Sequence, residues 1–171
     1  CYLEGYLWDN KNAKAAMQKM VNIAKNDNQK ISLTLSDRFC VDRHRDSFAE
    51  LIKNDIDILF ANEDEINAML MVSNIEDSIK KLKDMKIISA ITMGEKGSVI
   101  ISNGETINVK AIPVNKVIDT TGAGDLFASG FLYGIANDKS LEESAKFGSI
   151  AAGEIISHYG TKSEKQLSNL I

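Results

Sequence analysis

A run of small residues between two carboxylates, Asp119-Thr120-Thr121-Gly122-Ala123-Gly124-Asp125, comes directly before the apolar stretch Leu-Phe-Ala-Ser-Gly-Phe. The apolar stretch predicts a helix over 122–137, with the small residues at its N-terminus. N–H groups in the first turn of a helix have no partner inside it and carry partial positive charge, so they favour phosphate oxygens. An acid there disfavours a bound anion, but it fits a group that orients, or takes the proton from, an attacking hydroxyl. Taken alone, Asp125 is more typical of ordinary helix capping.

The whole string is more specific than its parts. D-T-T-G-A-G-D followed by F-x-x-G-F resembles the second signature of the PfkB carbohydrate kinase family, also called the ribokinase family. The resemblance implies an ATP-dependent kinase in which Asp125 is the catalytic base and the amides of Gly122, Ala123 and Gly124 stabilise the transferring phosphoryl group. It also implies that Asp119 and Thr121 are candidate ligands of a monovalent cation such as K⁺, with Thr121 on the nucleotide side.

A second candidate site is Asn62-Glu63-Asp64-Glu65, where an apolar run ends and a helix is predicted to begin. On its own, this pattern favours a capped, acidic first turn. The segment is also similar to the N-x-x-E element of the PfkB family. That resemblance implies that Asn62 and Glu65, three residues apart and so on one helix face, organise a hydrated Mg²⁺ at the nucleotide phosphates.

A third candidate is the turn Thr92-Met93-Gly94-Glu95-Lys96-Gly97, which follows a predicted strand. As a lone T-x-G-x-x-G pattern it is typical of many turns. By resemblance to PfkB-like kinases, Thr92, Gly94 and Gly97 are expected to contact ATP. The sequence contains neither the G-x-x-x-x-G-K-[ST] pattern of P-loop enzymes nor the H-R-D and D-F-G loops of protein kinases.

Composition limits the partners. The 171 residues are 44% hydrophobic and 26% charged, which suits a globular α/β protein. The net charge is −4 and no basic face is apparent, so we expect no nucleic-acid partner. The sequence lacks an apolar run of about 18 residues, which argues against a membrane span or partner. Two cysteines are too few for a disulfide scaffold and favour a reducing cytoplasm.

Two further clusters are predicted to have no catalytic role. Arg38 and the run Arg43-His44-Arg45 alternate with acids and are expected in a solvated loop, and the stretch from Cys40 to His44 is expected to bind no metal. The methionines are expected in the core, namely Met17, Met20, Met69, Met71 and Met85.

Strands and helices alternate along the chain. Strands are predicted over 2–8, 31–35, 55–61, 88–93, 98–102 and 106–109, the last two joined at Asn103-Gly104. Helices are predicted over 11–26, 43–54, 63–71, 75–85, 122–137, 141–158 and about 163–170. The inward face of the first helix is expected to hold Ala13, Ala16, Met17, Met20 and Ile23. The pattern predicts an α/β fold with a mainly parallel, ribokinase-like sheet flanked by helices and a late antiparallel hairpin.

The chain opens with Cys1 in a strand-like segment, without a lead-in. We expect residues 1–171 to be the C-terminal, nucleotide-binding and catalytic portion of a PfkB-type kinase domain, without the N-terminal part and its β lid. Alone, this portion is expected to bind ATP weakly, to be inactive and to have an aggregation-prone sheet edge.

The sequence determines the acceptor of the phosphoryl group less well than any other part of the expected function. The segments Ile31–Ser36 and Asp55–Glu63 resemble those of adenosine kinase-like members, which favours a primary hydroxyl of adenosine or a similar nucleoside or sugar. A ribokinase- or fructokinase-like sugar kinase, and a non-catalytic PfkB-like protein that binds nucleotide, stay open as alternatives. A small-molecule substrate is the expected partner, and a homodimer stays open.

Overall fold

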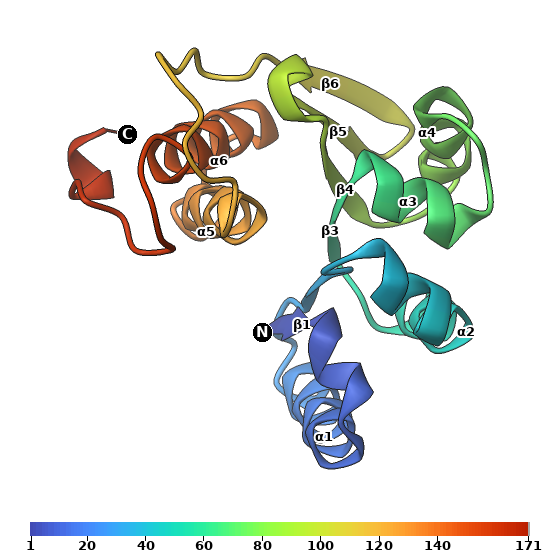
Figure 1. Ribbon diagram of the computed structural model, residues 1–171. Helices are drawn as coiled ribbons and strands as arrows, with labels where there is room; N and C mark the ends of the chain where they lie inside the picture. Colours follow the sequence, from blue (N-terminus) through green and yellow to red (C-terminus); the bar gives the residue numbers. More distant parts are fainter. Residues whose placement is uncertain (171) are drawn as a thin grey trace. The chain divides into compact units, whose positions relative to one another are not determined.

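Six strands form one sheet in the order β1-β2-β3-β4-β5-β6 in a computed structural model, which describes residues 1–170 (Figure 1). The sheet is mostly parallel, with antiparallel strands at its end, as predicted. The strands are β1 (Tyr2–Glu4), β2 (Ser32–Thr34), β3 (Ile58–Asn62), β4 (Ile88–Thr92), β5 (Ser98–Ser102) and β6 (Glu105–Val109). The helices are α1 (Lys11–Asn26), α2 (Arg38–Asn54), α3 (Glu63–Leu70), α4 (Ile75–Lys83), α5 (Ala123–Ala136) and α6 (Leu141–Ile155). Short 3₁₀ turns lie at η1 (Gly5–Asp9), η2 (Gly94–Lys96) and η3 (Leu167–Asn169).

Two compact units divide the chain. The first comprises Cys1–Ile91 and Ile101–Thr106, and the second comprises Thr92–Ile100 and Ile107–Ile171. Asn62 and Glu65 belong to the first unit, and the other predicted site residues belong to the second.

Parallel pairing organises the first unit. Leu33 of β2 lies opposite Leu3 of β1 and opposite Leu59 of β3, and all three are buried. Right-handed crossovers between parallel strands place the connecting helices on one face of the sheet. In Figure 1, α2, α3 and α4 accordingly lie on the same side of β3 and β4. Residues 58–61 of β3 are all buried, as expected for a strand in the middle of a parallel sheet.

Close approach of two helices organises the second unit. A Cβ at Gly130 of α5 would lie 2.6 Å from the Phe147 carbonyl oxygen, and one at Gly148 of α6 would lie 2.7 Å from that of Phe127. Contacts this short exclude any side chain, so α5 and α6 pack backbone against backbone at these glycines. This packing fixes the direction of α5, whose N-terminus is formed by the small-residue run.

Several predicted elements are confirmed. The helix over 11–26 and the strand over 98–102 have the predicted bounds. Asn103 and Gly104 both have positive φ, 50° and 79°, as a tight hairpin turn between β5 and β6 requires. Other boundaries differ by a few residues: the helix expected over 141–158 ends at Ile155, and only Leu167–Asn169 forms a turn in the segment 163–170.

The strand expected over 2–8 was wrong beyond Glu4, because the chain turns into η1. Trp8 explains the turn: it is 3% exposed, packs on Phe48 with ring centroids 5.5 Å apart, and donates from Nε1 to Ser47 Oγ at 2.9 Å. After Glu4 the chain therefore packs onto α2 through Trp8 and does not continue the pairing with β2.

The helix predicted over 43–54 is present but begins earlier, at Arg38, so the solvated loop expected for Arg38 and Arg43-His44-Arg45 was wrong. Asp37 caps the helix by accepting from the Cys40 N–H at 2.6 Å. Arg43 pairs with Asp9 at 2.7 Å. The cap and the ion pair both favour a helical conformation for this charged segment, and the partner of Arg43, 34 residues away, is not apparent from the sequence alone.

The inward face of α1 was also predicted wrongly in part. The buried residues are Met17, Val21 and Ala24, whereas Met20 is 45% and Ile23 is 51% exposed. Among the other methionines expected in the core, Met69 is buried, Met85 is half-buried and Met71 is 75% exposed.

Candidate active site

The N-terminus of α5 presents free amide groups. Gly122 precedes the helix with φ +81°, a left-handed conformation that glycine adopts without strain. The Ala123 N–H donates to the Thr120 carbonyl at 3.1 Å, so this amide is already engaged. Over the described residues, the N–H groups of Gly122, Gly124 and Asp125 have no partner within the protein. Three donors at the positive end of a 14-residue helix form a favourable environment for an anion.

Asp125 and Gly124 are both exposed in this turn. A Cβ at Gly124 would meet nothing within 4 Å, so the glycine is not required by the packing of the chain itself. Asp125 itself carries one of the three free amides, and its exposed carboxylate is in a position open to a small molecule.

Asp119 organises the approach to this turn. Its Oδ1 accepts from the Thr121 N–H at 2.9 Å and from Thr121 Oγ1 at 2.7 Å, and its Oδ2 accepts from the Gly160 N–H at 3.3 Å. These hydrogen bonds, led by that of the Thr121 hydroxyl, hold the pKa of Asp119 below its usual value. The structure thereby joins the 119–122 segment to the chain that follows α6.

Asn62 and Glu65 form a reciprocal capping box at the start of α3. The Asn62 side chain accepts from the Glu65 N–H at 2.9 Å, and the two Glu65 carboxylate oxygens accept from the Asn62 N–H at 2.9 Å and from Asn62 Nδ2 at 2.6 Å. Glu65 is 6% exposed, and burial raises its pKa to about 7. The predicted cap is therefore present, and both Glu65 oxygens are engaged by Asn62, which suits contact with a metal through water more than direct coordination.

Three side chains near Glu65 were missed by the sequence analysis: Glu4, Tyr6 and Asp37. The charges of Asp37 and Glu4 add to the rise in the Glu65 pKa, after burial. Tyr6 donates to Asp37, and this hydrogen bond raises the pKa of the phenol to about 12. Glu4 ends β1 and Asp37 follows β2, so these acids come from the carboxyl ends of neighbouring parallel strands, where α/β proteins place their ligands. Among the described residues, however, no group of three or more acids, histidines or cysteines is close enough together to hold a metal ion, so these acids do not by themselves form a metal site.

The Thr92–Gly97 turn is dominated by packing at Gly97. This residue has φ +96°, and a Cβ there would lie 2.1 Å from the Val109 carbonyl oxygen. Its carbonyl also accepts from the Met93 N–H at 2.8 Å, which closes the turn. Gly94 has φ +58°, and a Cβ built on it would meet no atom within 4 Å, so unlike Gly97 it is not required by packing. Gly97 is thus required by the fold whether or not it also contacts a nucleotide.

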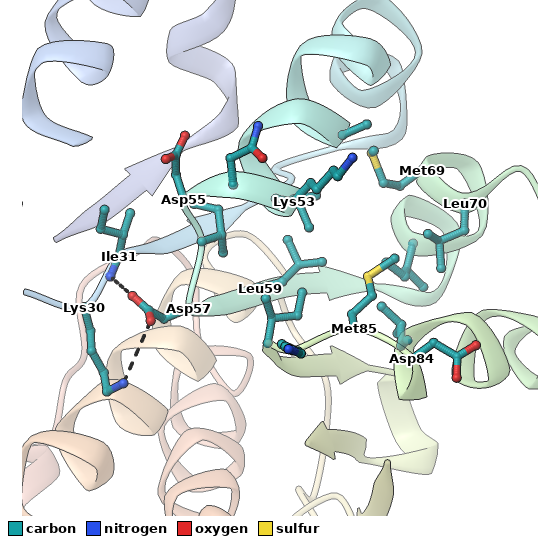
Figure 2. Close-up of a pocket in the computed structure, with 18 of the residues that line it drawn as sticks. Lys30, Ile31, Lys53, Asp55, Asp57, Leu59, Met69, Leu70, Asp84 and Met85 are labelled. Atoms are coloured by element: carbon teal, nitrogen blue, oxygen red, sulfur yellow. Dashed lines mark hydrogen bonds and ion pairs between the residues drawn. The ribbon is translucent and has the colours of Figure 1, made fainter. Parts of the chain in front are cut away.

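A cavity of about 950 Å³ lies elsewhere in the first unit (Figure 2). It is lined by residues before β2, β3 and β4 and by α2, α3 and α4, and Asp57 at its rim pairs with Lys30 at 3.9 Å and accepts from the Ile31 N–H at 2.8 Å. The cavity therefore opens at the amino ends of these strands, whereas Asn62 lies at the carboxyl end of β3. None of the predicted site residues lines it.

The family assignment follows from comparison with known proteins. Residues 1–167 match the model of the pfkB family carbohydrate kinases, and the chain belongs to that family. It is therefore related to sugar and nucleoside kinases, as the D-T-T-G-A-G-D string predicted.

Two solved structures share the fold over almost the whole of this chain. A probable sugar kinase from Rhizobium etli is 44% identical with a TM-score of 0.95, and adenosine kinase from Sinorhizobium meliloti is 40% identical with a TM-score of 0.95. Each match covers 99% of this chain and 52% of the other. A fructokinase from Vibrio cholerae, solved with fructose, ADP and a calcium ion, is 18% identical over 94% of this chain and 55% of its own, with a TM-score of 0.84, and shows the fold alone.

Among curated proteins, a cytidine kinase from Thermococcus kodakarensis is 32% identical over 69% of this chain and 43% of its own length. The chain spans about half the length of the curated relatives it matches. None of the helices over residues 1–170 combines the length and the apolar character needed to cross a bilayer.

Proposed function

We propose that residues 1–171 are the nucleotide-binding and catalytic portion of an ATP-dependent kinase, which transfers the γ-phosphoryl group to a primary hydroxyl of adenosine or a similar nucleoside or sugar. The observation that supports this most directly is the α5 N-terminus, where free amides adjoin the exposed carboxylate of Asp125. The family to which the chain belongs consists of carbohydrate kinases, which makes phosphoryl transfer the natural use of such a turn.

In the proposed reaction, the amides of Gly122 and Gly124 donate hydrogen bonds to the oxygens of the γ-phosphoryl group as charge develops on them. Ala123 is the third proposed donor, and its N–H also donates to the Thr120 carbonyl at 3.1 Å, which shapes the turn. Asp125 accepts a hydrogen bond from the acceptor hydroxyl and takes its proton as the new O–P bond forms. The bond between the γ-phosphorus and the β–γ bridging oxygen breaks, and ADP leaves.

The remaining residues bind and orient. We assign Thr92, Gly94, Gly97 and Thr121 to the nucleotide side, with Gly97 acting through the shape of its turn. Asn62 and Glu65 would hold Mg²⁺ through water, and the ion would neutralise phosphate charge. Asp119, with Thr121, is the candidate ligand for a monovalent cation such as K⁺.

Adenosine is the first acceptor to test because the chain is 40% identical to an adenosine kinase. A sugar acceptor is the second candidate, since the sugar kinase from Rhizobium etli is 44% identical. The test is ATP-dependent ADP release by the full-length protein with adenosine, ribose and fructose, each at matched concentration. We expect the largest kcat/KM with adenosine.

Each alternative has its own outcome in this assay. Faster turnover of ribose or fructose would replace the nucleoside acceptor with a sugar. ATP binding without acceptor-dependent ADP release would support a non-catalytic nucleotide-binding protein and overturn the proposed activity. A parallel assay of residues 1–171 alone tests the expectation that this portion is inactive without the rest of the protein.

A further inference from the structure

A buried carboxylate on α6 has no assigned role in the proposed reaction. Glu154 lies in the last turn of α6, and its side chain is only 2% exposed. Acids are rarely buried to this extent unless they have specific partners. The partners of Glu154 all belong to the segment 157–165, which follows α6 and which we name the return loop.

The return loop is attached to Glu154 at both ends. Near its start, His158 Nε2 lies 3.2 Å from Glu154 Oε1. At its end, the N–H groups of Glu164 and Lys165 donate to the same oxygen at 3.0 and 3.2 Å. Burial opposes ionisation of Glu154, but hydrogen bonds from Ser163, His158 and the two amides hold the pKa of the carboxyl below its usual value. One ionised oxygen thus closes the loop with charge-assisted hydrogen bonds.

The middle of the return loop contacts the segment before α5. Gly160, with φ +91°, donates its N–H to Asp119 Oδ2 at 3.3 Å. Thr161 lies against Gly122, because a Cβ built on that glycine would be 3.4 Å from Thr161 Cγ2. The Ile118 N–H also donates to the Ile156 carbonyl at 2.8 Å, which ties the two segments together just before these contacts.

We propose that Glu154 is a positioning residue for the turn at the α5 N-terminus: it holds the return loop closed, and the loop in turn fixes Asp119 and Gly122. The inference rests on the proposed function, since the turn matters for catalysis only if it binds the transferring phosphoryl group. Free amides stabilise a transition state only when they are held in place before the reaction. The 119–122 segment has no regular secondary structure of its own, so its position depends on these contacts.

The test compares Glu154→Ala, Glu154→Gln and Glu142→Ala in the full-length protein. Glu142 is on the same helix but is 55% exposed and pairs only with Lys146, so its variant controls for loss of an acid from α6. With MgATP and adenosine, we expect Glu154→Ala to lower kcat about 10- to 100-fold while the KM for adenosine changes by less than about threefold. Glu154→Gln, which keeps one neutral acceptor for the loop amides, should retain part of the lost turnover. Glu142→Ala should match the unmodified protein.

Amide hydrogen exchange supplies a readout that does not depend on activity. In Glu154→Ala, exchange should accelerate in the return loop and also in residues 120–125, where Glu154 makes no contact of its own. Faster exchange in the return loop alone, with kcat unchanged, would overturn the proposal. If no acceptor is phosphorylated even by the unmodified protein, the proposed function fails, yet the exchange at residues 120–125 still decides the positioning role.

A second variant guards against misfolding of Glu154→Ala. Thr161 is exposed, so Thr161→Gly removes its contact with Gly122 without opening the core. We expect thermal unfolding close to that of the unmodified protein, with a lower kcat and faster exchange at residues 120–125. Unchanged kcat and unchanged exchange in this variant would also refute the coupling.

Discussion

Both carboxylate oxygens of Glu65 accept hydrogen bonds from one residue, Asn62, through its backbone N–H at 2.9 Å and its Nδ2 at 2.6 Å. The pair therefore caps α3 and at the same time holds an acid in a largely buried position. Burial disfavours the charged form of the acid, and its pKa rises to about 7. Ionised Glu65 therefore destabilises the fold. A bound cation would offset this destabilisation, which agrees with a role for Glu65 in binding a cation.

The first prediction concerns the pH dependence of stability. The pKa of Glu65 is raised in the folded state from its ordinary 4.5 to about 7, so its contribution to stability is fully present below 4.5 and is lost as pH rises through 7. At about 1.4 kcal/mol per pH unit, the loss amounts to about 3 kcal/mol. Relative to Glu65→Gln, whose side chain does not titrate, the unmodified protein should therefore become less stable between pH 4.5 and pH 8. Urea unfolding across this range, without metal, measures the difference.

The matched control for this experiment is Glu76→Gln. Glu76 also lies in the first turn of a helix, α4, but it is exposed. The variant Glu76→Gln therefore controls for the loss of an acid from the first turn of a helix. If the Glu65→Gln and unmodified curves run parallel instead, the pKa of Glu65 is not raised in the folded state.

A second prediction separates capping from metal binding. Asn62 and Asn74 are both N-cap residues whose side chains accept an N–H at 2.9 Å, from Glu65 and Asp77 respectively. Replacing either by Ala should cost about 1 kcal/mol in unfolding free energy. Only Asn62→Ala should also raise the Mg²⁺ concentration for half-maximal activity, by about tenfold, because Asn62 orients Glu65. Equal Mg²⁺ dependence in the two variants would mean that Asn62 acts only as the N-cap of α3 and not in metal binding.

How far the sequence predicted the fold depended on whether the signal was local. Lys11–Asn26 has its own N-cap, Asn10, and the 98–109 hairpin has its own Asn-Gly turn, so both were predicted closely. The early start of α2 was missed although its N-cap, Asp37, is local, and the ion pair of Arg43 in this helix is with Asp9, 34 residues apart. A pattern along the chain contains no information on such a partner.

The candidate site shows the same division. The D-T-T-G-A-G-D string and the N-x-x-E element lie on continuous stretches of chain and were found from sequence. Glu4 and Asp37 were not found, because single acids after predicted strands gain meaning only when parallel pairing brings the strand ends together. The return loop was missed for a related reason: its contact with Gly122 joins residues 39 positions apart, from Gly122 to Thr161.

A third prediction contrasts two glycines of α5. Gly124→Ala adds a Cβ that meets nothing, so stability should stay within about 1 kcal/mol of the unmodified protein or rise slightly. Gly130→Ala adds a Cβ only 2.6 Å from the Phe147 carbonyl oxygen and should cost about 1–3 kcal/mol. If Gly124 lies against a phosphate, its variant should nevertheless lose at least about tenfold in kcat/KM for ATP, a loss of about 1.4 kcal/mol. Thermal unfolding and initial rates on both variants check the contrast. If Gly124→Ala is stable and fully active, the proposal that phosphate binds at this turn is wrong.

The last prediction concerns Asp125, which is exposed and whose side chain has no hydrogen-bond partner among the described residues. Asp125→Asn should therefore leave the fold intact, with at most about 0.5 kcal/mol lost from its favourable position in the first turn of α5. Because an amide cannot take the acceptor's proton, kcat should fall by about 10²–10⁴ while the KM for ATP changes little. The control is Asp138→Asn, an exposed acid just beyond the other end of α5, which should retain normal kinetics. Steady-state ADP release with adenosine decides the matter: if Asp125→Asn keeps more than about a tenth of normal turnover, a different group must accept the proton.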